Sequence, residues 1–307
     1  MLKKLSGYTL ALIGLTAFFT SSCKKEYASI NNVDSTAITT YIKQNNLTSS
    51  MVEDSAKTGF YYQIITPGTG KTFANSDSVL YNYSIKGLDN GVVYQPERPN
   101  GNYGTFVGYT YNVTYVSSSV ANLVVISAVR EVMEKLKPGG SARILIPSYL
   151  AFGKNGLGGI PANENIDMTV TVYPETVQWQ LDDRLIREFI AAKGLTMIKD
   201  PSRIYYSIAN VGSGTYPITD NSGIYCNYTL RLRDGLVLDT ETDFFGTLGS
   251  GGLIAGWTLI LPGKLQKGGQ MRFIVPSDLA YGTTTTTGGL QGNTILDYSI
   301  TITSVTQ

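Results

Sequence analysis

The chain has 307 residues, a formal net charge of +1 at pH 7, no histidine and two cysteines. A charge this close to zero gives no electrostatic footprint for nucleic acid, and the lack of histidine excludes His-based triads and His-ligated metals. Two cysteines are too few for a thiolate metal cluster. We therefore expect no metal, no cofactor and no nucleic-acid partner.

The first residues have the form of an export signal. Lys3 and Lys4 precede an apolar run over residues 8–19, which ends in small residues before Cys23. The run has about 12 residues, whereas a membrane-spanning helix needs ~20. Its ending at a cysteine resembles a bacterial lipoprotein signal, in which that cysteine is lipidated. An ordinary secretory signal with an incidental cysteine is the alternative.

This resemblance divides the start of the chain into two segments. We predict that residues 1–22 are a lipoprotein signal peptide and that residues 23–33 are a polar tether. Lipid attached at Cys23 would anchor the protein to a membrane. The expected location is the cell envelope, at the periplasmic face or the outer membrane.

The first half of the chain then predicts a helix, a strand and a second helix. Asp34-Ser35 are N-cap candidates for a short amphipathic helix with an apolar face over residues 38–42. Alternating residues 77–85 predict a half-buried strand, and Asp89-Asn90-Gly91 a tight turn. An apolar stripe at helical spacing over residues 125–136 predicts another helix.

A long internal repeat sets the domain count. Residues 139–153 and 268–282 share the frame Gly-Gly-x-x-Arg, an apolar strand, then Pro-Ser-x-Leu-Ala-aromatic-Gly. The match extends upstream to residues 38–48 and 186–196. A repeat of this length is a duplicated domain and not a solenoid, whose periods are ~20–50 residues. We predict one domain over residues 34–175 (the first domain), and a helical link with a second domain over 176–307 (the second domain).

The helical link is predicted over residues 181–193, with Gly194 in the C′ position. Leu185, Ile186, Phe189 and Ile190 form its apolar stripe. The stripe either packs within the chain or acts as a dimerising arm.

The remaining segments predict strands. Residues 166–172, 223–232 and 295–305 alternate in the manner of half-buried strands, and Cys226 within them is interpreted as a small buried hydrophobe. A sheet with one short helix against it is an α+β domain.

The motifs of the second domain resemble the FKBP-type peptidyl-prolyl cis-trans isomerases. The resemblance rests on Leu-Ile-Ala-Gly-Trp at 253–257, Gly268-Gly269, Val275-Pro276, Leu-Ala-Tyr-Gly at 279–282, and upstream on Tyr228, Asp234-Gly235 and Leu238-Asp239. The first domain matches through Val125-Ile126, residues 150–153 and residues 160–163. The likeness covers nearly everything from about Gly59 to the C-terminus, apart from the link.

The resemblance implies two FKBP-like domains of the α+β class. Each would be a twisted antiparallel sheet wrapped around a short helix, with an apolar pocket between them, and each would be preceded by an amphipathic helix. The implied activity is rotation about X-Pro bonds, whose barrier of about 18–20 kcal/mol comes from amide resonance. No nucleophile is required, because the pocket only has to bind the twisted amide better than either planar form.

The same resemblance assigns roles in the second domain. Trp257 would be the floor under the proline ring, Asp239 would lie beside the carbonyl of the twisting amide, and the Ile254 N–H and Tyr281 hydroxyl would hold flanking carbonyls. The walls would be Tyr228, Phe244, Tyr298, Leu253 and Leu290, with Leu238 in place of the family's phenylalanine.

Both domains depart from the family pattern. In the first domain Val129, Phe152 and Met168 replace three aromatic positions, Gln95 stands where the aspartate belongs, and an extra segment occupies residues 99–119. These changes imply a weak or inactive copy. In the second, Pro262-Gly263 interrupts the central helix, and a Thr/Gly segment over 283–289 replaces the usual flap.

The leading interpretation is an isomerase of the bacterial envelope that binds proline-containing segments of exported proteins, with the second domain catalytic. A non-catalytic chaperone or adaptor with FKBP-like pockets is the main alternative. A cell-surface glycan-binding protein is a third, drawn from the 21 tyrosines and the anchor. The first two differ in whether Trp257, Asp239 and Tyr281 converge on one open pocket.

Overall fold

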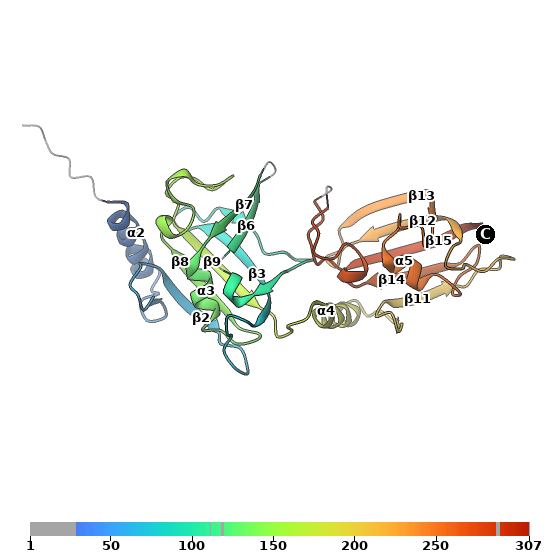
Figure 1. The fold of residues 1–307 in the computed structure, drawn as a ribbon, viewed down its shortest axis with the longest axis horizontal. Helices are drawn as coiled ribbons and strands as arrows, with labels where there is room; N and C mark the ends of the chain where they lie inside the picture. Colours follow the sequence, from blue (N-terminus) through green and yellow to red (C-terminus); the bar gives the residue numbers. More distant parts are fainter. Residues whose placement is uncertain (1–28, 111, 118–119, 287–288, 307) are drawn as a thin grey trace, which may run out of the picture.

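The computed structural model describes residues 29–110, 112–117, 120–286 and 289–306. The predicted signal peptide and Cys23 lie outside these residues. Two β-sheet domains follow one another along the long axis of the molecule, with helix α4 (Gln178–Ala192) between them in the chain (Figure 1). In the described part of the chain, no helix is both long and apolar enough to cross a membrane.

The two main sheets have the same strand order. In the first domain the order is β1-β2-β8-β9-β3-β4, with β5 also paired to β3, and in the second it is β10-β11-β14-β15-β12-β13. The strands of the first sheet are β1 (Val52–Glu53), β2 (Tyr61–Thr66), β3 (Ser78–Gly87), β4 (Val93–Gln95), β5 (Tyr103–Phe106), β8 (Ser141–Ile146) and β9 (Ile166–Val172). Those of the second are β10 (Ile198–Lys199), β11 (Tyr205–Asn210), β12 (Gly223–Arg231), β13 (Val237–Thr247), β14 (Gln270–Val275) and β15 (Leu296–Thr306). The predicted domain duplication and the α+β class are confirmed.

One short helix packs against each sheet. Helix α3 (Ser127–Met133) lies in the core of the first domain and α5 (Ala255–Ile260) in that of the second. The first is shorter than the predicted 125–136, because Val125 ends strand β7 (Val120–Val125), which pairs with β6 (Asn112–Ser117). Helix α5 ends before Pro262, as predicted, since proline removes a donor and clashes with the preceding turn.

Each domain is preceded by a helix that an aspartate clamps to the repeated Pro-Ser motif. In helix α2 (Ile30–Gln44), Asp34 accepts hydrogen bonds from the Ser148 N–H at 2.9 Å and its hydroxyl at 2.7 Å. In α4, Asp182 accepts the same two bonds from Ser277, at 2.8 and 2.7 Å. Both aspartates are buried. The Pro-Ser frame therefore recurs because it holds the helix that precedes each domain.

The clamp corrects the predicted start of the first helix. Asp34 is not an N-cap, because its carboxylate is used by Ser148; the cap is Ser29, whose side chain accepts from the Asn32 N–H. The helix thus begins at Ile30, inside the segment predicted as tether.

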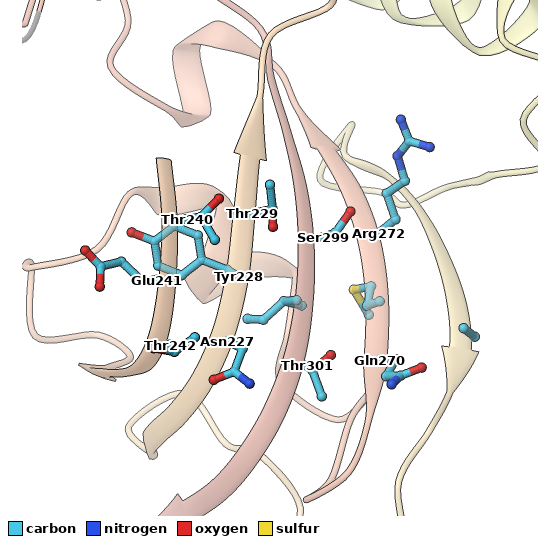
Figure 2. Close-up of a pocket in the computed structure, with 13 residues that line it drawn as sticks. Asn227, Tyr228, Thr229, Thr240, Glu241, Thr242, Gln270, Arg272, Ser299 and Thr301 are labelled. Atoms are coloured by element: carbon cyan, nitrogen blue, oxygen red, sulfur yellow. The ribbon is translucent and has the colours of Figure 1, made fainter. Parts of the chain in front are cut away.

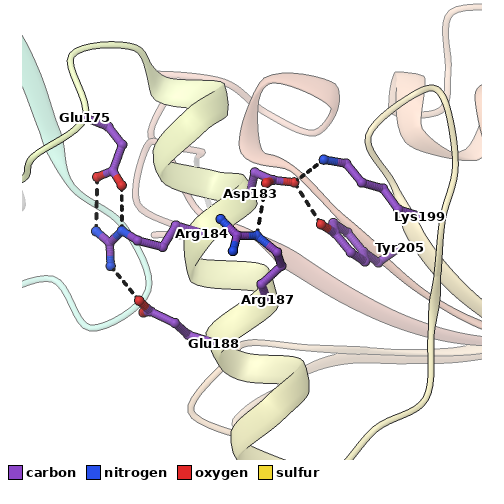
Figure 3. A network of polar contacts seen from close by, with 7 residues as sticks. All are labelled: Glu175, Asp183, Arg184, Arg187, Glu188, Lys199 and Tyr205. Atoms are coloured by element: carbon purple, nitrogen blue, oxygen red, sulfur yellow. Dashed lines mark hydrogen bonds and ion pairs between the residues drawn. The ribbon is translucent and has the colours of Figure 1, made fainter.

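Helix α4 is fixed to the chain on two sides. Its apolar stripe packs with buried Tyr205, Ile274 and Ile295 of the second domain, so the packing interpretation of the stripe is confirmed. On its charged side, Arg184 forms a salt bridge with Glu175 at 2.6 Å and Asp183 forms one with Lys199 (Figure 3). Gly194 follows the helix at φ 62°, the left-handed conformation expected of C′.

Candidate active site

Four aromatic rings of the second domain pack together, with Trp257 as a floor and Tyr228, Tyr298 and Phe244 as walls around it. Trp257, in α5, is 3% exposed, and the rings of Tyr228, Tyr298 and Phe244 stand at 90°, 89° and 69° to its indole. Their centroids lie 5.4–5.9 Å from that of Trp257, the range of favourable edge-to-face packing. Strands β12, β15 and β13 each supply one wall.

These rings border a hollow of about 480 Å³, which we call the aromatic hollow. Its lining residues are Tyr228, Phe244, Gly251, Gly252, Leu253, Ile254, Ala255, Trp257, Ala280, Tyr281 and Tyr298. Ile254 directly precedes α5, at the end of a helix where backbone N–H groups lack intrahelical partners. Tyr281 is 43% exposed and does not point into the core. Leu259 and Ile260 are not among the lining residues, so neither fills the hollow.

Asp239 lies at the border of a neighbouring hollow. The Tyr228 hydroxyl donates a hydrogen bond of 2.6 Å to its carboxylate. Asp239, Leu238 and Leu290 line a hollow of about 620 Å³, which we call the flanking hollow. Tyr228 thus connects the two hollows. Its ring lines the aromatic hollow, and its hydroxyl donates to the carboxylate of Asp239, which lines the flanking hollow. Trp257 and Tyr281 share a hollow, whereas Asp239 reaches it through Tyr228.

Burial raises the pKa values of two tyrosines of the site, Tyr228 and Tyr298. Burial, followed by the hydrogen bond to Asp239, raises the pKa of Tyr228 above its usual value. Burial, with the nearby Tyr281 as the second cause, likewise raises the pKa of Tyr298. Tyrosine is already protonated at neutral pH, and these shifts extend the protonated range of both hydroxyls to higher pH. In the part of the chain that the structure describes, no group of three or more acidic or cysteine side chains could hold a metal ion.

Comparison with known proteins decides the family. The family model described as FKBP-type peptidyl-prolyl cis-trans isomerase matches residues 70–173 and 214–303, together more than half of the chain. The chain belongs to this family. The matched segments include both core helices and most strands of both sheets.

Two curated relatives share part of their length with this FKBP-type chain. The isomerase FkpA of Escherichia coli strain K12 is 28% identical over 116 residues, which are 36% of this chain and 36% of that protein. The macrophage infectivity potentiator of Trypanosoma cruzi is 31% identical over 110 residues, 35% of this chain and 56% of that protein. The chain therefore matches about a third to just over half of these proteins.

Two solved structures are similar to this chain over about two fifths of its length. A peptidyl-prolyl isomerase from Pseudomonas syringae pv. tomato has 27% identity and a TM-score of 0.36, covering 42% of this chain and 96% of that one. The structure of FkpA from Escherichia coli has 26% identity and a TM-score of 0.35, covering 41% and 58%.

The first FKBP domain has no comparable arrangement at the equivalent positions. Val129 and Met168 are fully buried, and Phe152 nearly so. Tyr83, which corresponds to Tyr228, is covered by Tyr103 from β5, with ring centroids 4.5 Å apart. The extra segment therefore packs an aromatic ring over the buried tyrosine.

Strand register confirms the loss of the acid in the first domain. Ile85 of β3 pairs with Gln95, and its counterpart Leu230 of β12 pairs with Asp239. The Gln95 amide donates to the neighbouring Pro96 carbonyl. No carboxylate stands at this position to accept from a tyrosine hydroxyl.

Two features of the site were not predicted from the sequence. Phe273 is fully buried and supports both Trp257, at 6.1 Å, and Tyr298, on which it stacks at 5.3 Å. Its place in the repeated strand, where Ile144 stands in the first domain, gave a usable signal. The Asp182–Ser277 clamp was signalled too, since Asp34 and Asp182 occupy equivalent places in the repeat.

A polar hollow occupies the opposite face of the same sheet (Figure 2). Asn227 and Thr229 alternate with Tyr228 along β12, so their side chains leave on the other face. Thr240, Ser299 and Arg272 of neighbouring strands join them there. Tyr228 also borders this hollow, but Trp257, Phe244 and Tyr298 do not, so the hollow lacks the floor and two of the walls that would hold a proline ring.

Proposed function

We propose that this protein is a peptidyl-prolyl cis-trans isomerase whose catalytic site is the aromatic hollow of the second domain. The observation that carries the proposal is the geometry of the rings, in which a buried indole forms a floor between upright aromatic walls. A pyrrolidine ring fits such an apolar box, and family membership supports the same function.

The residues of the hollow provide what the reaction needs. The planar amide is stabilised by a charge-separated resonance form, which a dry apolar surface disfavours relative to the twisted amide. Asp239, held by Tyr228, would lie beside the carbonyl of the twisting bond, and Ile254 and Tyr281 at the rim would hold the flanking carbonyls. Each 1.4 kcal/mol of preference for the twisted form increases the rate about tenfold.

The first domain is proposed as a structural or substrate-holding partner. Val129 and Met168 stand where the second domain has Trp257 and Tyr298, and Gln95 stands in place of the acid. The substrates are proposed to be proline-containing segments of exported proteins, met in the bacterial envelope where lipid at Cys23 tethers the chain. Dimerisation through the linking helices stays a prediction, and it would have to use a side of α4 other than its packed stripe.

The test is NMR exchange on a short Ala-Pro peptide with the full chain and two matched variants. Asp239→Ala and Gln95→Ala remove the side chains at the same register position of the two domains. We expect the wild type to accelerate exchange well above background, Asp239→Ala to reduce the acceleration, and Gln95→Ala to leave it unchanged. Thermal unfolding of each variant controls for folding.

The alternative of a binding module without catalysis has one observation in its favour, because Asp239 and Trp257 line different hollows. A folded wild type that binds the peptide without accelerating exchange would establish that alternative. Equal losses in both variants would move catalysis away from the aromatic hollow.

A further inference from the structure

The flanking hollow is built by both domains. On one side it has Leu238, Asp239 and Leu290 of the second domain. On the other it has Pro99 and Asn100, which belong to the loop between β4 and β5 of the first domain. In Figure 1 this loop extends from the first domain to the segment that precedes β15.

The loop is anchored at its base to the first domain. The buried Asn82 side chain holds the backbone of Arg98, donating to its carbonyl at 2.8 Å and accepting from its N–H at 3.0 Å. The Arg98 guanidinium lies 3.6 Å from the centre of the Tyr103 ring. The base is therefore ordered by contacts within its own domain.

The tip of the loop is locked to the second domain. Asn100 donates to the Asp234 carboxylate at 2.7 Å, and Arg233 donates to the Pro99 carbonyl at 3.1 Å. Asn293 donates to the Asn102 side chain at 3.1 Å. Asn100 and Asn102 are only 5% and 2% exposed, so the bonds of the two asparagines are shielded from water, whereas the Arg233 bond is exposed.

Gly101, between the two asparagines, makes the closest approach. A Cβ at this position would lie 2.5 Å from the Gly292 carbonyl oxygen, which is backbone and cannot rotate away. A side chain at residue 101 would therefore force the loop off the second domain.

The flanking hollow adjoins the aromatic hollow, because Tyr228 of one is hydrogen-bonded to Asp239 of the other. Its lining combines five apolar side chains, Leu232, Leu236, Leu238, Leu290 and Pro99, with the polar Asn100, Thr286, Gln291 and Thr294 and two acids. Its two acids are engaged: Asp234 with Asn100, and Asp239 with Tyr228. Such a surface accepts an apolar side chain.

We propose that residues 99–102 of the first domain form a specificity subsite for the second domain, which holds an apolar substrate residue that lies beyond the immediate neighbours of the isomerised X-Pro pair. This rests on the proposed function, and it gives the first domain a role in that function: it completes the substrate groove of its neighbour. Peptides too short to reach the loop gain nothing from it, whereas extended polypeptides do.

The test compares two peptides on the full-length chain. The short one carries Ala-Pro and one residue on each side, and the long one extends both sides with leucine-containing segments. Binding is measured by anisotropy of a labelled peptide and catalysis by NMR exchange. The variants are Pro99→Ser, which alters the wall but keeps the carbonyl that Arg233 uses, and Gly101→Val, which displaces the loop. The control is Pro96→Ser, at an exposed proline of the same loop outside the lining.

We expect Pro99→Ser and Gly101→Val to weaken binding and kcat/KM for the long peptide roughly tenfold, the scale of losing apolar contact in a pocket. The short peptide and the Pro96→Ser control should be unaffected. Unchanged binding of the long peptide, or equal losses for both peptides, would overturn the subsite. Absence of exchange with the wild-type chain would overturn the proposed activity instead, and the binding arm would still decide the subsite.

Discussion

Tyr228 has two roles in the candidate site, and one substitution can separate them. Its ring packs against Trp257 and Phe244, while its hydroxyl donates to Asp239 at 2.6 Å. Tyr228→Phe keeps the wall and removes the bond that orients the carboxylate. A hydrogen bond to a charged group contributes about 1.5–3 kcal/mol, and partial exposure of this pair places the effect at the lower end.

We therefore expect Tyr228→Phe to lower kcat/KM roughly tenfold with little change in peptide binding, because 1.4 kcal/mol corresponds to tenfold in rate. NMR exchange rates and peptide anisotropy measure the two quantities. Tyr83→Phe is the matched control, since Tyr83 holds the same position in the first domain. A loss of binding equal to the loss of rate would mean that the hydroxyl acts on the ground state and not on the twisted amide.

At the scale of the element, neighbouring aspartates of helix α4 have opposite pH behaviour. Burial raises the pKa of Asp182, although its bonds with Ser277 and Gln178 oppose the rise. Burial alone would also raise the pKa of Asp183, but hydrogen bonds from Lys199 and Tyr205 outweigh it and lower that pKa (Figure 3). Ionisation of Asp182 thus costs stability, whereas ionisation of Asp183 adds to it.

These directions predict how two variants behave. The stability associated with protonated Asp182 is present at low pH and is lost as the pH rises through its raised folded-state pKa. That associated with charged Asp183 is present above its unfolded pKa of about 3.9 and is lost as the pH falls through its lowered folded-state pKa. As the pH rises from about 3 to about 7, the free energy of unfolding of Asp182→Asn should increase relative to that of wild type. The free energy of unfolding of Asp183→Asn should decrease relative to wild type over the same interval.

Tryptophan fluorescence measures both variants, because the two tryptophans, Trp179 and Trp257, lie in α4 and α5. Unfolding midpoints at the two pH values give the differences from wild type. If the variants shift in the same direction, the opposite environments of the two carboxylates are not what sets the pH dependence.

The repeat explains why so much of the fold could be predicted from the sequence. A duplicated domain displays each structural requirement twice. Arg143 and Arg272 occupy the same place in the repeat, and each donates two hydrogen bonds to an aspartate of the next strand, Arg143 to Asp167 and Arg272 to Asp297. The aromatic residues of the site were predicted in another way, from the positions at which the second domain resembles its family, because the first domain does not repeat them. Helix ends were less predictable, because the Asp34 side chain is taken by a residue more than a hundred positions away.

At the scale of the whole molecule, contacts between the domains could not be predicted. Asn100, Asn102 and Asn293 read as loop residues in the sequence, and nothing in local pattern shows that they meet. The extra segment was expected to mark a degenerate copy. In the structure it does two things: Tyr103 covers the first domain's tyrosine, and Pro99 borders the second domain's flanking hollow.

The proposed tether makes a prediction about where the whole molecule resides. If Cys23 carries lipid, Cys23→Ser should move the protein from the membrane fraction to the soluble fraction of a bacterial host while isomerase activity per molecule stays constant, because both hollows lie far along the chain from residue 23. Fractionation with immunoblotting and exchange assays measures both. The control is Cys226→Ser, at the buried thiol whose pKa burial raises to about 12 and which is inert for that reason. An ordinary secretory signal would leave wild type and Cys23→Ser equally soluble, so the fractionation decides between the two interpretations of the N-terminus.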